Sequence, residues 1–308
     1  MSFLIKNEFN YDIVITCYNS DVTIGRAITS ALNQIIIPKN IIIVDDNSQD
    51  GSIEIINDLK TSNSIIKVLL NNINMGQSYC RNQGVNLSTS EYVMFLDDDD
   101  FSLPERSIMH SNMFQEGAQI SFVSSIKNYA NGYSVACKNT DVNNRKFHAT
   151  EMLDYLITGT GQNFPYKVYI PASTCAVNVE CYKGLGGFDT SLRRLEDVDF
   201  AIRVAKEEFC FSWTSEIGVN RFFSHRIDKG RGIDSKYEIM ILNKFQDLIE
   251  NVKFNDIVLY AKLREIYFGK HYLMGFFFVI THPSSVKIIR KKILVLISRV
   301  IHDLRRLG

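Results

Sequence analysis

Short apolar runs alternate with segments of helical periodicity over residues 11–100, and this alternation limits the folds open to the chain. The apolar runs are Asp12–Cys17, Ile41–Val44, Ile65–Leu70 and Tyr92–Leu96. Between the first two runs, apolar side chains recur at the spacing of an amphipathic helix at Ile24, Ala27, Ile28 and Ala31. Continuous apolar strands separated by helices form a parallel sheet that is covered on both faces. We therefore predict an α/β fold in which right-handed crossovers bring the carboxyl ends of the strands to one edge.

The composition indicates a globular protein with balanced charge. The 308 residues are 45% hydrophobic and contain 34 Lys or Arg against 34 Asp or Glu. Such a length supports one large domain or two smaller ones, and the zero formal net charge gives no reason to expect nucleic acid as a partner. The six cysteines form no CxxC pair, so we expect free thiols in a reducing cytoplasm. We expect neither a signal peptide nor a transmembrane helix, because no apolar segment is long enough for either.

Polar clusters follow three of the four predicted strands. They are Thr16-Cys17-Tyr18-Asn19, Asp45-Asp46-Asn47-Ser48 and Asp97-Asp98-Asp99-Asp100. Because parallel sheets bind ligands at the carboxyl ends of their strands, the three clusters predict one pocket. In that pocket Thr16 and Tyr18 could flank a nucleobase, and Asp46 could accept a hydrogen bond from it.

The four consecutive acids at 97–100 indicate a metal site. Adjacent carboxylates repel one another, and a hard divalent cation with oxygen ligands relieves that repulsion. A metal held there could bind a diphosphate. The alternative is a solvated acidic loop, or a helix cap ahead of Pro104. The chain has no GxGxxG or Walker pattern, which disfavours dinucleotide-binding and ATP-hydrolysing proteins.

Six motifs in order carry a resemblance to a known family over roughly residues 11 to 235. They are Thr16–Asn19, Val44–Ser52, Asn74–Gly76 with Arg81–Gly84, Phe95–Asp100 with Pro104, Gly186–Asp189, and Glu196–Phe200. In this order and spacing the chain resembles a family 2 glycosyltransferase, an inverting enzyme of the GT-A fold, although the family often has proline where Thr16 stands. The resemblance implies a Rossmann-like, mostly parallel central sheet flanked by helices, a nucleotide-sugar donor that is usually a UDP-sugar, and Mn²⁺ or Mg²⁺.

The resemblance also assigns roles to single residues. The donor-binding positions, of which Thr16, Tyr18 and Asp46 would hold the uracil, are Thr16, Tyr18, Asn19, Asp45, Asp46, Arg81, Asp97, Asp98 and Arg231. Turn chemistry is the alternative for Asp45, and a place on an exposed helix surface is the alternative for Arg81. The metal ligands would be Asp99 and His225. A structural role is the alternative for His225, and a helix cap is the alternative for Asp100.

Asp197 matches the position of the catalytic base in the family. It stands at the start of a predicted helix, Glu196–Glu208, where the helix dipole is expected to lower the pKa of a carboxylate. A helix cap is the alternative role for an acid at this place, and it fits Glu196 or Asp199 better than Asp197. The residues expected close to the donor sugar or the acceptor are Gly186, Gly187 and Glu196.

We predict three regions along the chain. A nucleotide-sugar-binding half covers 1–100, an acceptor-binding and catalytic half of the same domain covers 101–234, and a helical C-terminal region covers 235–308. Residues 281–308 carry seven basic side chains and one acidic side chain, with apolar residues on one helical side. Such a helix can lie on an anionic membrane surface, and packing against a partner helix or against the rest of the chain is the alternative.

The combined prediction is a metal-dependent, inverting glycosyltransferase that is cytoplasmic and peripheral at the inner face of the cell membrane. It would move a hexosyl or N-acetylhexosaminyl group from a UDP-sugar to a hydroxyl of a glycan or glycolipid during surface polysaccharide or glycolipid synthesis. A nucleotidyltransferase is disfavoured, because no glycine-rich basic loop follows the first strand. A sugar-nucleotide-binding module without activity is disfavoured, because mere binding has no need of a base at Asp197. The irregular region 127–185 is expected to set the sugar.

Overall fold

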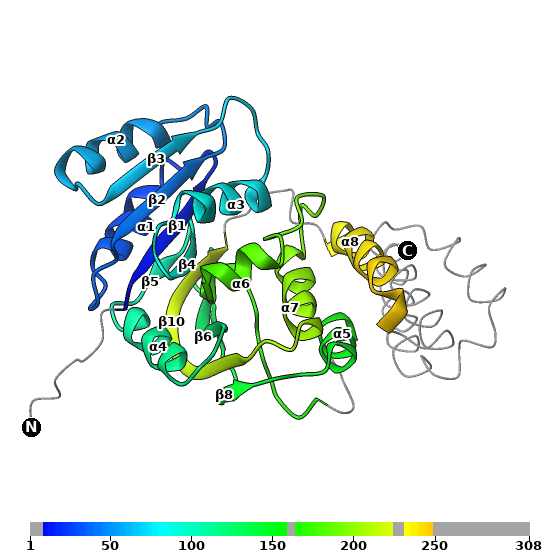
Figure 1. Cartoon of the computed structure of the whole chain (residues 1–308). Helices are drawn as coiled ribbons and strands as arrows, with labels where there is room; N and C mark the ends of the chain where they lie inside the picture. Colours follow the sequence, from blue (N-terminus) through cyan, green and yellow to red (C-terminus); the bar gives the residue numbers. More distant parts are fainter. Residues whose placement is uncertain (1–8, 159–163, 224–230, 249–308) are drawn as a thin grey trace, which may run out of the picture. The chain divides into compact units, whose positions relative to one another are not determined.

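Strand and helix alternate through the first part of the chain, as the sequence pattern predicts (Figure 1). The computed structural model describes residues 9–158, 164–223 and 231–248. The elements up to residue 97 are β1 (Tyr11–Cys17), α1 (Ile24–Leu32), β2 (Asn40–Asp45), α2 (Ser52–Ser62), β3 (Ile66–Leu70), α3 (Gln77–Leu87) and β4 (Tyr92–Asp97). β1 pairs in parallel with β2 and with β4, and β2 pairs in parallel with β3. The predicted parallel half-sheet is therefore confirmed.

The second part of the chain completes the same sheet. Its elements are β5 (Phe101–Ser102), α4 (Arg106–Gln115), β6 (Ile120–Tyr129), β7 (Ser134–Cys137), β8 (Val142–Arg145), α5 (Ala149–Thr158), the 3-10 turn η1 (Ala172–Thr174), β9 (Cys175–Asn178), α6 (Val179–Gly184), α7 (Glu196–Lys206) and β10 (Phe211–Phe223). The strand order is β3-β2-β1-β4-β9-β6-β10-β5, with β7 on β6 and β8 on β10. β9 is antiparallel to both β4 and β6, so β6 and β10 run parallel to β4. The carboxyl ends of six strands thus share one edge.

The described residues belong to two compact units. The first contains Met1–Met152 and Gly161–His225 and holds the sheet. The second contains Leu153–Thr160 and Arg226–Gly308, and its described elements are the end of α5, the helix α8 (Arg231–Lys244) and the turn η2 (Gln246–Leu248). The predicted boundary at residue 235 stays a prediction. Among the helices that the structure describes, none is both long and apolar enough to span a bilayer.

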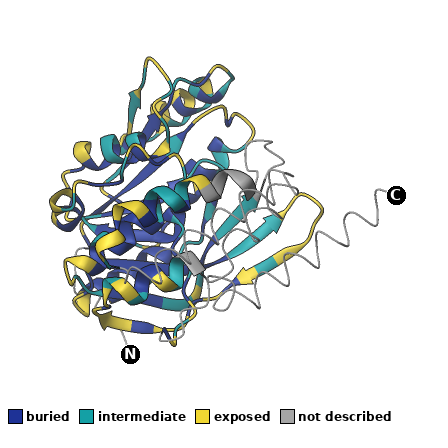
Figure 2. Cartoon of the chain, turned by 90° about the vertical axis from the view of Figure 1, so that its right-hand side faces the viewer, coloured by how far each residue is buried: buried dark blue, intermediate teal, exposed yellow. Residues whose placement is uncertain are grey.

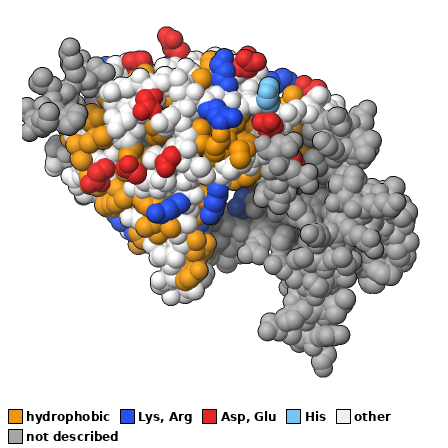
Figure 3. Space-filling model, turned by 90° about the horizontal axis from the view of Figure 1, so that it is seen from below, with side chains coloured by type: hydrophobic (Ala, Val, Ile, Leu, Met, Phe, Trp, Pro, Cys, Tyr) orange, Lys and Arg blue, Asp and Glu red, His pale blue; other side chains and the backbone are white. Residues whose placement is uncertain are grey.

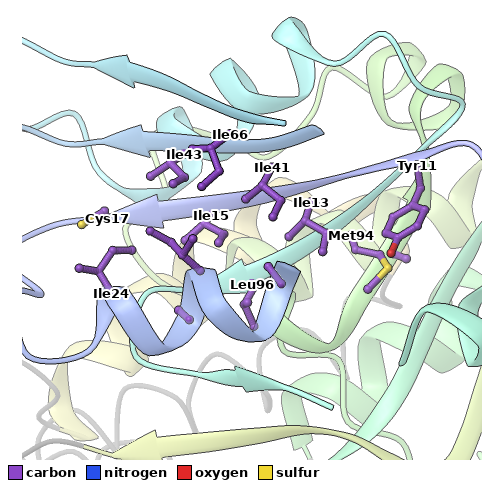
Figure 4. Packing of buried hydrophobic residues seen from close by; sticks show 14 of the residues in the cluster. Tyr11, Ile13, Ile15, Cys17, Ile24, Ile41, Ile43, Ile66, Met94 and Leu96 are labelled. Carbon is purple, nitrogen blue, oxygen red and sulfur yellow. The ribbon is translucent and has the colours of Figure 1, made fainter. Parts of the chain in front are cut away.

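The strand β1 lies in the core and is buried on both of its faces. Ile13 and Ile15 pack with Ile24 of α1 and with the neighbouring strands (Figure 4). Val14 points to the other face, where Gly84 of α3 lies against it. The strands in the middle of the sheet are almost entirely buried, while exposed residues lie on the outer helices and loops (Figure 2). This explains why the strands have continuous apolar sequences.

Other expectations from the sequence also hold. All six cysteines are free, and five of them are buried. Trp213 of β10 is fully buried, as expected for a core residue. On the face shown in Figure 3, acidic and basic side chains are interspersed with hydrophobic ones, in keeping with the equal numbers of the two charges. The region 127–185, expected to be irregular, is more regular than that, since it continues β6 into a hairpin with β7 and contributes β8.

We expect Gly84→Ala to destabilise the protein although alanine is the better helix former. A Cβ at Gly84 would lie 2.4 Å from Val14 Cγ1, inside the contact between α3 and β1. Overpacking of this kind costs about 1–3 kcal/mol, which exceeds the helix propensity gained. The free energy of unfolding in urea measures the effect. Gly184→Ala is the control, since nothing lies within 4 Å of a Cβ there, and it should leave stability equal or slightly higher.

Candidate active site

The four acids at the end of β4 divide into two groups. Carboxylate oxygens of Asp97, Asp99 and Asp100 lie within 4.8 Å of one another. The carboxylate of Asp98 instead accepts hydrogen bonds from the backbone N–H of Tyr18, at 3.0 Å, and from the hydroxyl of Ser20. Asp98 therefore ties the acidic cluster to the loop that follows β1. Burial raises the pKa of Asp98 to about 6, despite these hydrogen bonds.

Asp100 is a buried member of the cluster, and the prediction that it caps the next helix is wrong. Its Oδ1 accepts a hydrogen bond from the backbone N–H of Phe222 at 3.1 Å, and its Oδ2 lies 3.6 Å from Arg221 Nε. The residue that precedes α4 is Glu105, and no side chain caps that helix. The pKa of Asp100 is raised to about 7, mainly by burial and also by the neighbouring acid Asp97.

The cluster fits a hard divalent cation. Each of Asp97, Asp99 and Asp100 offers a carboxylate oxygen, the ligand type that such cations prefer. Among the described residues, the buried Oδ2 of Asp100 has no hydrogen-bond partner, so a lone pair remains for a ligand. The prediction placed Asp99 on the metal with His225, and Asp97 on the donor. The structure instead groups Asp97 with Asp99, while His225 lies outside the described residues.

Arg81 joins the acidic cluster to α7. Its guanidinium bridges two carboxylates, with Nη2 2.7 Å from Asp97 Oδ1 and Nη1 2.7 Å from Glu196 Oε1. Gln77 also donates to Glu196, at 2.9 Å. Only 2% of the Arg81 side chain is exposed, so the alternative of a helix-surface arginine is wrong. Glu196, predicted close to the sugar or acceptor, is itself buried in this bridge.

Asp197 lies in the first turn of α7, next to Glu196. The residue before the helix is Leu195, in the left-handed conformation with φ 62°, and no side chain caps the helix. The alternative that Glu196 or Asp199 serves as the cap is therefore wrong. The fully buried Asp199 pairs with Arg203 at 2.8 Å.

The predicted lowering of the pKa of Asp197 is also wrong. Its pKa is raised to about 7, mainly by burial and also by the adjacent carboxylate of Glu196. The hydrogen bond from Val198 N–H and the charges of Arg81 and Arg221 lower it by less. Loss of hydration thus outweighs the favourable field at the start of the helix. A carboxylate with such a pKa can exchange a proton near neutral pH.

The acids at the end of β2 organise loops. Asp45 is buried and accepts two hydrogen bonds from Ser48, which is the geometry of the turn alternative. Asp46 accepts hydrogen bonds from the backbone N–H groups of Met75 and Gly76, at 2.8 and 2.7 Å. These bonds hold the loop that leads into α3, and Gly76 adopts φ 90° there. Contact of either acid with a donor stays a prediction.

The remaining predicted residues lie around the same edge or outside the described part. Tyr18 is 41% exposed. Asn19 follows it in the left-handed conformation, and its side chain accepts a hydrogen bond from Gln49 N–H. Gly186 and Gly187 have φ 79° and 71°, and a Cβ on Gly187 would lie 2.5 Å from Asn82 Oδ1. Thr16 is register partner of Asp97. Arg231 is the first residue of α8.

Two arginines of the site were missed. Arg221 lies beside Asp100, and Arg26 donates to the backbone carbonyl of Asp99 at 2.6 Å while stacking on the Phe222 ring at 3.9 Å. Arg221 could have been predicted from its place near the carboxyl end of a strand. That prediction would have required knowing that β10 runs parallel to β4, which the sequence does not show. A separate groove of about 420 Å³, lined in part by Met109 of α4 and Trp213 of β10, includes none of the clustered acids.

We expect Arg81→Met to lower the free energy of unfolding by about 3–5 kcal/mol, because it leaves the buried Glu196 and the neighbouring Asp97 without their counter-charge. Urea unfolding measures the loss. The control is Lys146→Met, which removes an exposed ion pair with Glu208 at 3.6 Å and should cost less than about 1 kcal/mol. Equal stability of the two variants would contradict the bridging role.

Known proteins resemble this chain in sequence and in fold. The model of a protein family described as glycosyl transferase family 2 matches residues 12–173. A cholesterol galactosyltransferase of Borreliella burgdorferi is 36% identical over 96 residues, which are 31% of this chain and 26% of that protein. A GalNAc(5)-diNAcBac-PP-undecaprenol beta-1,3-glucosyltransferase of Campylobacter jejuni is 35% identical over 89 residues, which are 29% of each chain. The matches thus span between a quarter and a third of the length of these curated relatives.

A solved structure has the same fold. The crystal structure of S. aureus TarS 1-349 in complex with UDP-GlcNAc matches with a TM-score of 0.62 and 16% sequence identity. The match covers 83% of this chain and 72% of that chain. It confirms the predicted α/β architecture with a central sheet flanked by helices.

Proposed function

The chain belongs to glycosyl transferase family 2, and from this premise we propose that it transfers a sugar from a nucleotide diphosphate donor to a hydroxyl of a glycan or glycolipid. One observation carries the proposal. The Arg81 bridge joins a cluster of three carboxylates to Glu196. The residue after Glu196 is Asp197, the candidate base. A cation site and a base on the same edge of the sheet are the two parts that an inverting transfer needs.

The donor would bind at the ends of β1, β2 and β4. Thr16, Tyr18 and Asp46 would hold the base, and the exposed ring of Tyr18 offers a face on which it can stack. Asn19, Asp45 and Asp98 would support the nucleoside end of the donor, and a UDP-sugar is supported by the TarS complex with UDP-GlcNAc. Arg231 would lie over the diphosphate.

Asp97, Asp99 and Asp100 would hold Mn²⁺ or Mg²⁺, which supplies Lewis-acid stabilisation of the charge that grows on the departing nucleoside diphosphate. His225 is kept as a further candidate ligand. The base Asp197 would take the proton of the acceptor hydroxyl while the hydroxyl oxygen forms a bond to the anomeric carbon of the donor sugar. The bond from that carbon to the diphosphate oxygen breaks, and attack from the opposite side inverts the configuration.

Acceptor binding falls to the other half of the sheet. We assign 1–100 to the donor, 101–234 to the acceptor and the catalytic base, and 235–308 to a helical region. Gly186 and Gly187 would let the backbone approach the sugar. A lipid-linked or surface glycan is supported by the relatives named for cholesterol and undecaprenol substrates. A location at the inner face of the membrane, with contact through the basic segment 281–308, follows from such an acceptor, and that segment lies outside the described residues.

We expect the protein to release UDP from one of UDP-glucose, UDP-galactose, UDP-GlcNAc or UDP-GalNAc, and only in the presence of Mn²⁺ or Mg²⁺. Asp99→Asn should lower the rate by about 100-fold or more. Loss of a residue that only supports a metal ligand costs about 10–100-fold, and Asp99 is proposed as a ligand itself. Asp58→Asn, an exposed acid of α2, should leave the rate unchanged. Turnover that persists in EDTA would remove the metal role from the cluster.

We expect Asp197→Asn to lower kcat by about 10²–10⁴-fold, because proton transfer to a base contributes that much, while binding of UDP stays unchanged in calorimetry. The control is Glu207→Gln, the same chemical change at the exposed other end of α7, which should keep full activity.

We also expect the rate to follow the ionisation of Asp197. Its pKa is raised to about 7, so the carboxylate form that accepts the proton is lost as the pH falls below that value. kcat/KM should then fall about tenfold per pH unit on the acid side and level off above neutrality. A flat profile between pH 5 and pH 8 would rule out Asp197 as the base.

A further inference from the structure

The hairpin between β6 and β7 presents two tyrosines side by side. Tyr129 ends β6, Tyr133 precedes β7, and their ring centroids lie 6.1 Å apart with an interplanar angle of 27°. The turn is tied by hydrogen bonds from Tyr129 N–H to Tyr133 O and from Gly132 N–H to Tyr129 O, both 2.9 Å. Gly132 takes φ 80°, which closes a three-residue loop of a common hairpin type. The pair is therefore held in place by its backbone.

Both rings are exposed. Tyr133 is 64% exposed and Tyr129 is 40% exposed, so part of each ring faces solvent. The neighbouring side chains are polar, since Asn131 accepts from Tyr133 N–H and Ser134 donates to Asn128. A lipid-inserting surface carries a continuous apolar face, whereas this hairpin sets its two tyrosines among polar side chains. The surroundings suit a hydroxylated ligand better than a membrane.

The hairpin rises from the sheet edge that holds the acids. Phe222, whose N–H bonds to Asp100, is the register partner of Asn128, and Tyr129 is the next residue of β6. One strand spacing and one residue of rise separate the Cα atoms of Phe222 and Tyr129, about 6 Å. The hairpin lies in the half proposed to bind the acceptor, since β6 belongs to residues 101–234. A glycan that reaches the acidic cluster can thus reach the two rings.

We propose that the Tyr129–Tyr133 pair is a stacking platform for a pyranose ring of the acceptor glycan, which rests on the proposed glycosyltransferase function. A pyranose carries a face of C–H bonds with partial positive charge, and the face of an aromatic ring is negative. Tyrosine gives up few rotatable bonds when it binds, and the tied turn places both rings in advance. The platform holds a sugar unit beside the one that reacts and so selects acceptors that are at least disaccharides.

Saturation-transfer NMR with methyl β-D-glucopyranoside, methyl β-D-galactopyranoside, their N-acetylamino analogues, and lactose tests the platform without any turnover. We expect wild type to bind these sugars at millimolar concentration, with the strongest transfer to the protons on one ring face. The double variant Tyr129→Ala with Tyr133→Ala should weaken binding at least about fivefold, the order of an aromatic contact. Tyr129→Phe with Tyr133→Phe should keep it, because the rings remain.

The controls separate this proposal from the enzyme assignment. Ile37→Ala removes an apolar side chain of similar exposure, 60%, ahead of β2 and hence at the opposite end of the sheet, and should keep sugar binding. Calorimetry with UDP and Mn²⁺ should be the same for every variant, and failure of wild type there would count against the proposed function alone. If the alanine pair disturbs folding, Tyr133→Ala replaces it.

Three results would overturn the platform. The first is no saturation transfer from the wild-type protein to any of the sugars. The second is unchanged saturation transfer in the double alanine variant. The third is a double alanine variant that keeps sugar binding but no longer binds vesicles of phosphatidylcholine and phosphatidylglycerol. The last would identify the pair as a membrane contact.

Discussion

The buried bridge from Arg81 to Asp97 and Glu196 is the interaction on which the site depends. It links α3 and β4, which are consecutive in the chain, to α7, which lies 115 positions beyond Arg81. Burying a cation between two carboxylates is costly, and it is retained where each group is hydrogen-bonded and where removal of one partner would strand the others. Here the bridge fixes Glu196, and through it the first turn of α7 that carries Asp197. The geometry of the base therefore depends on the same guanidinium that neutralises part of the acidic cluster.

The acidic cluster combines ion pairs with burial. Arg81 pairs with Asp97, and Arg221 Nε lies 3.6 Å from Asp100 Oδ2. Burial then raises the pKa of Asp98 and of Asp100 toward neutrality. A divalent cation would reverse these shifts and order the carboxylates at once, so ligand binding and local stability are expected to be linked.

The sequence predicted the fold better than it predicted the state of the site residues. Periodicity and turn residues are local signals, so β1 to β4 and the helix α1 were predicted close to their observed bounds. The partners of Arg81 and Asp100 come from α7 and β10, more than a hundred positions away, and no local pattern encodes them. The pKa of Asp197 was predicted with the wrong sign, because its position on the helix is visible in the sequence and its burial is not. The hairpin that carries Tyr129 was hidden by the polar composition of its surroundings.

The antiparallel strand β9 has a consequence for how the chain acquires its structure. β4 has β1 on one side, and its other side is completed only by Cys175–Asn178, which are made long after Asp97. Until then an emerging chain has an open, apolar strand edge, which is a template for pairing with other chains. A fragment that ends near residue 100 would leave this edge of β4 unpaired, and we expect it to aggregate.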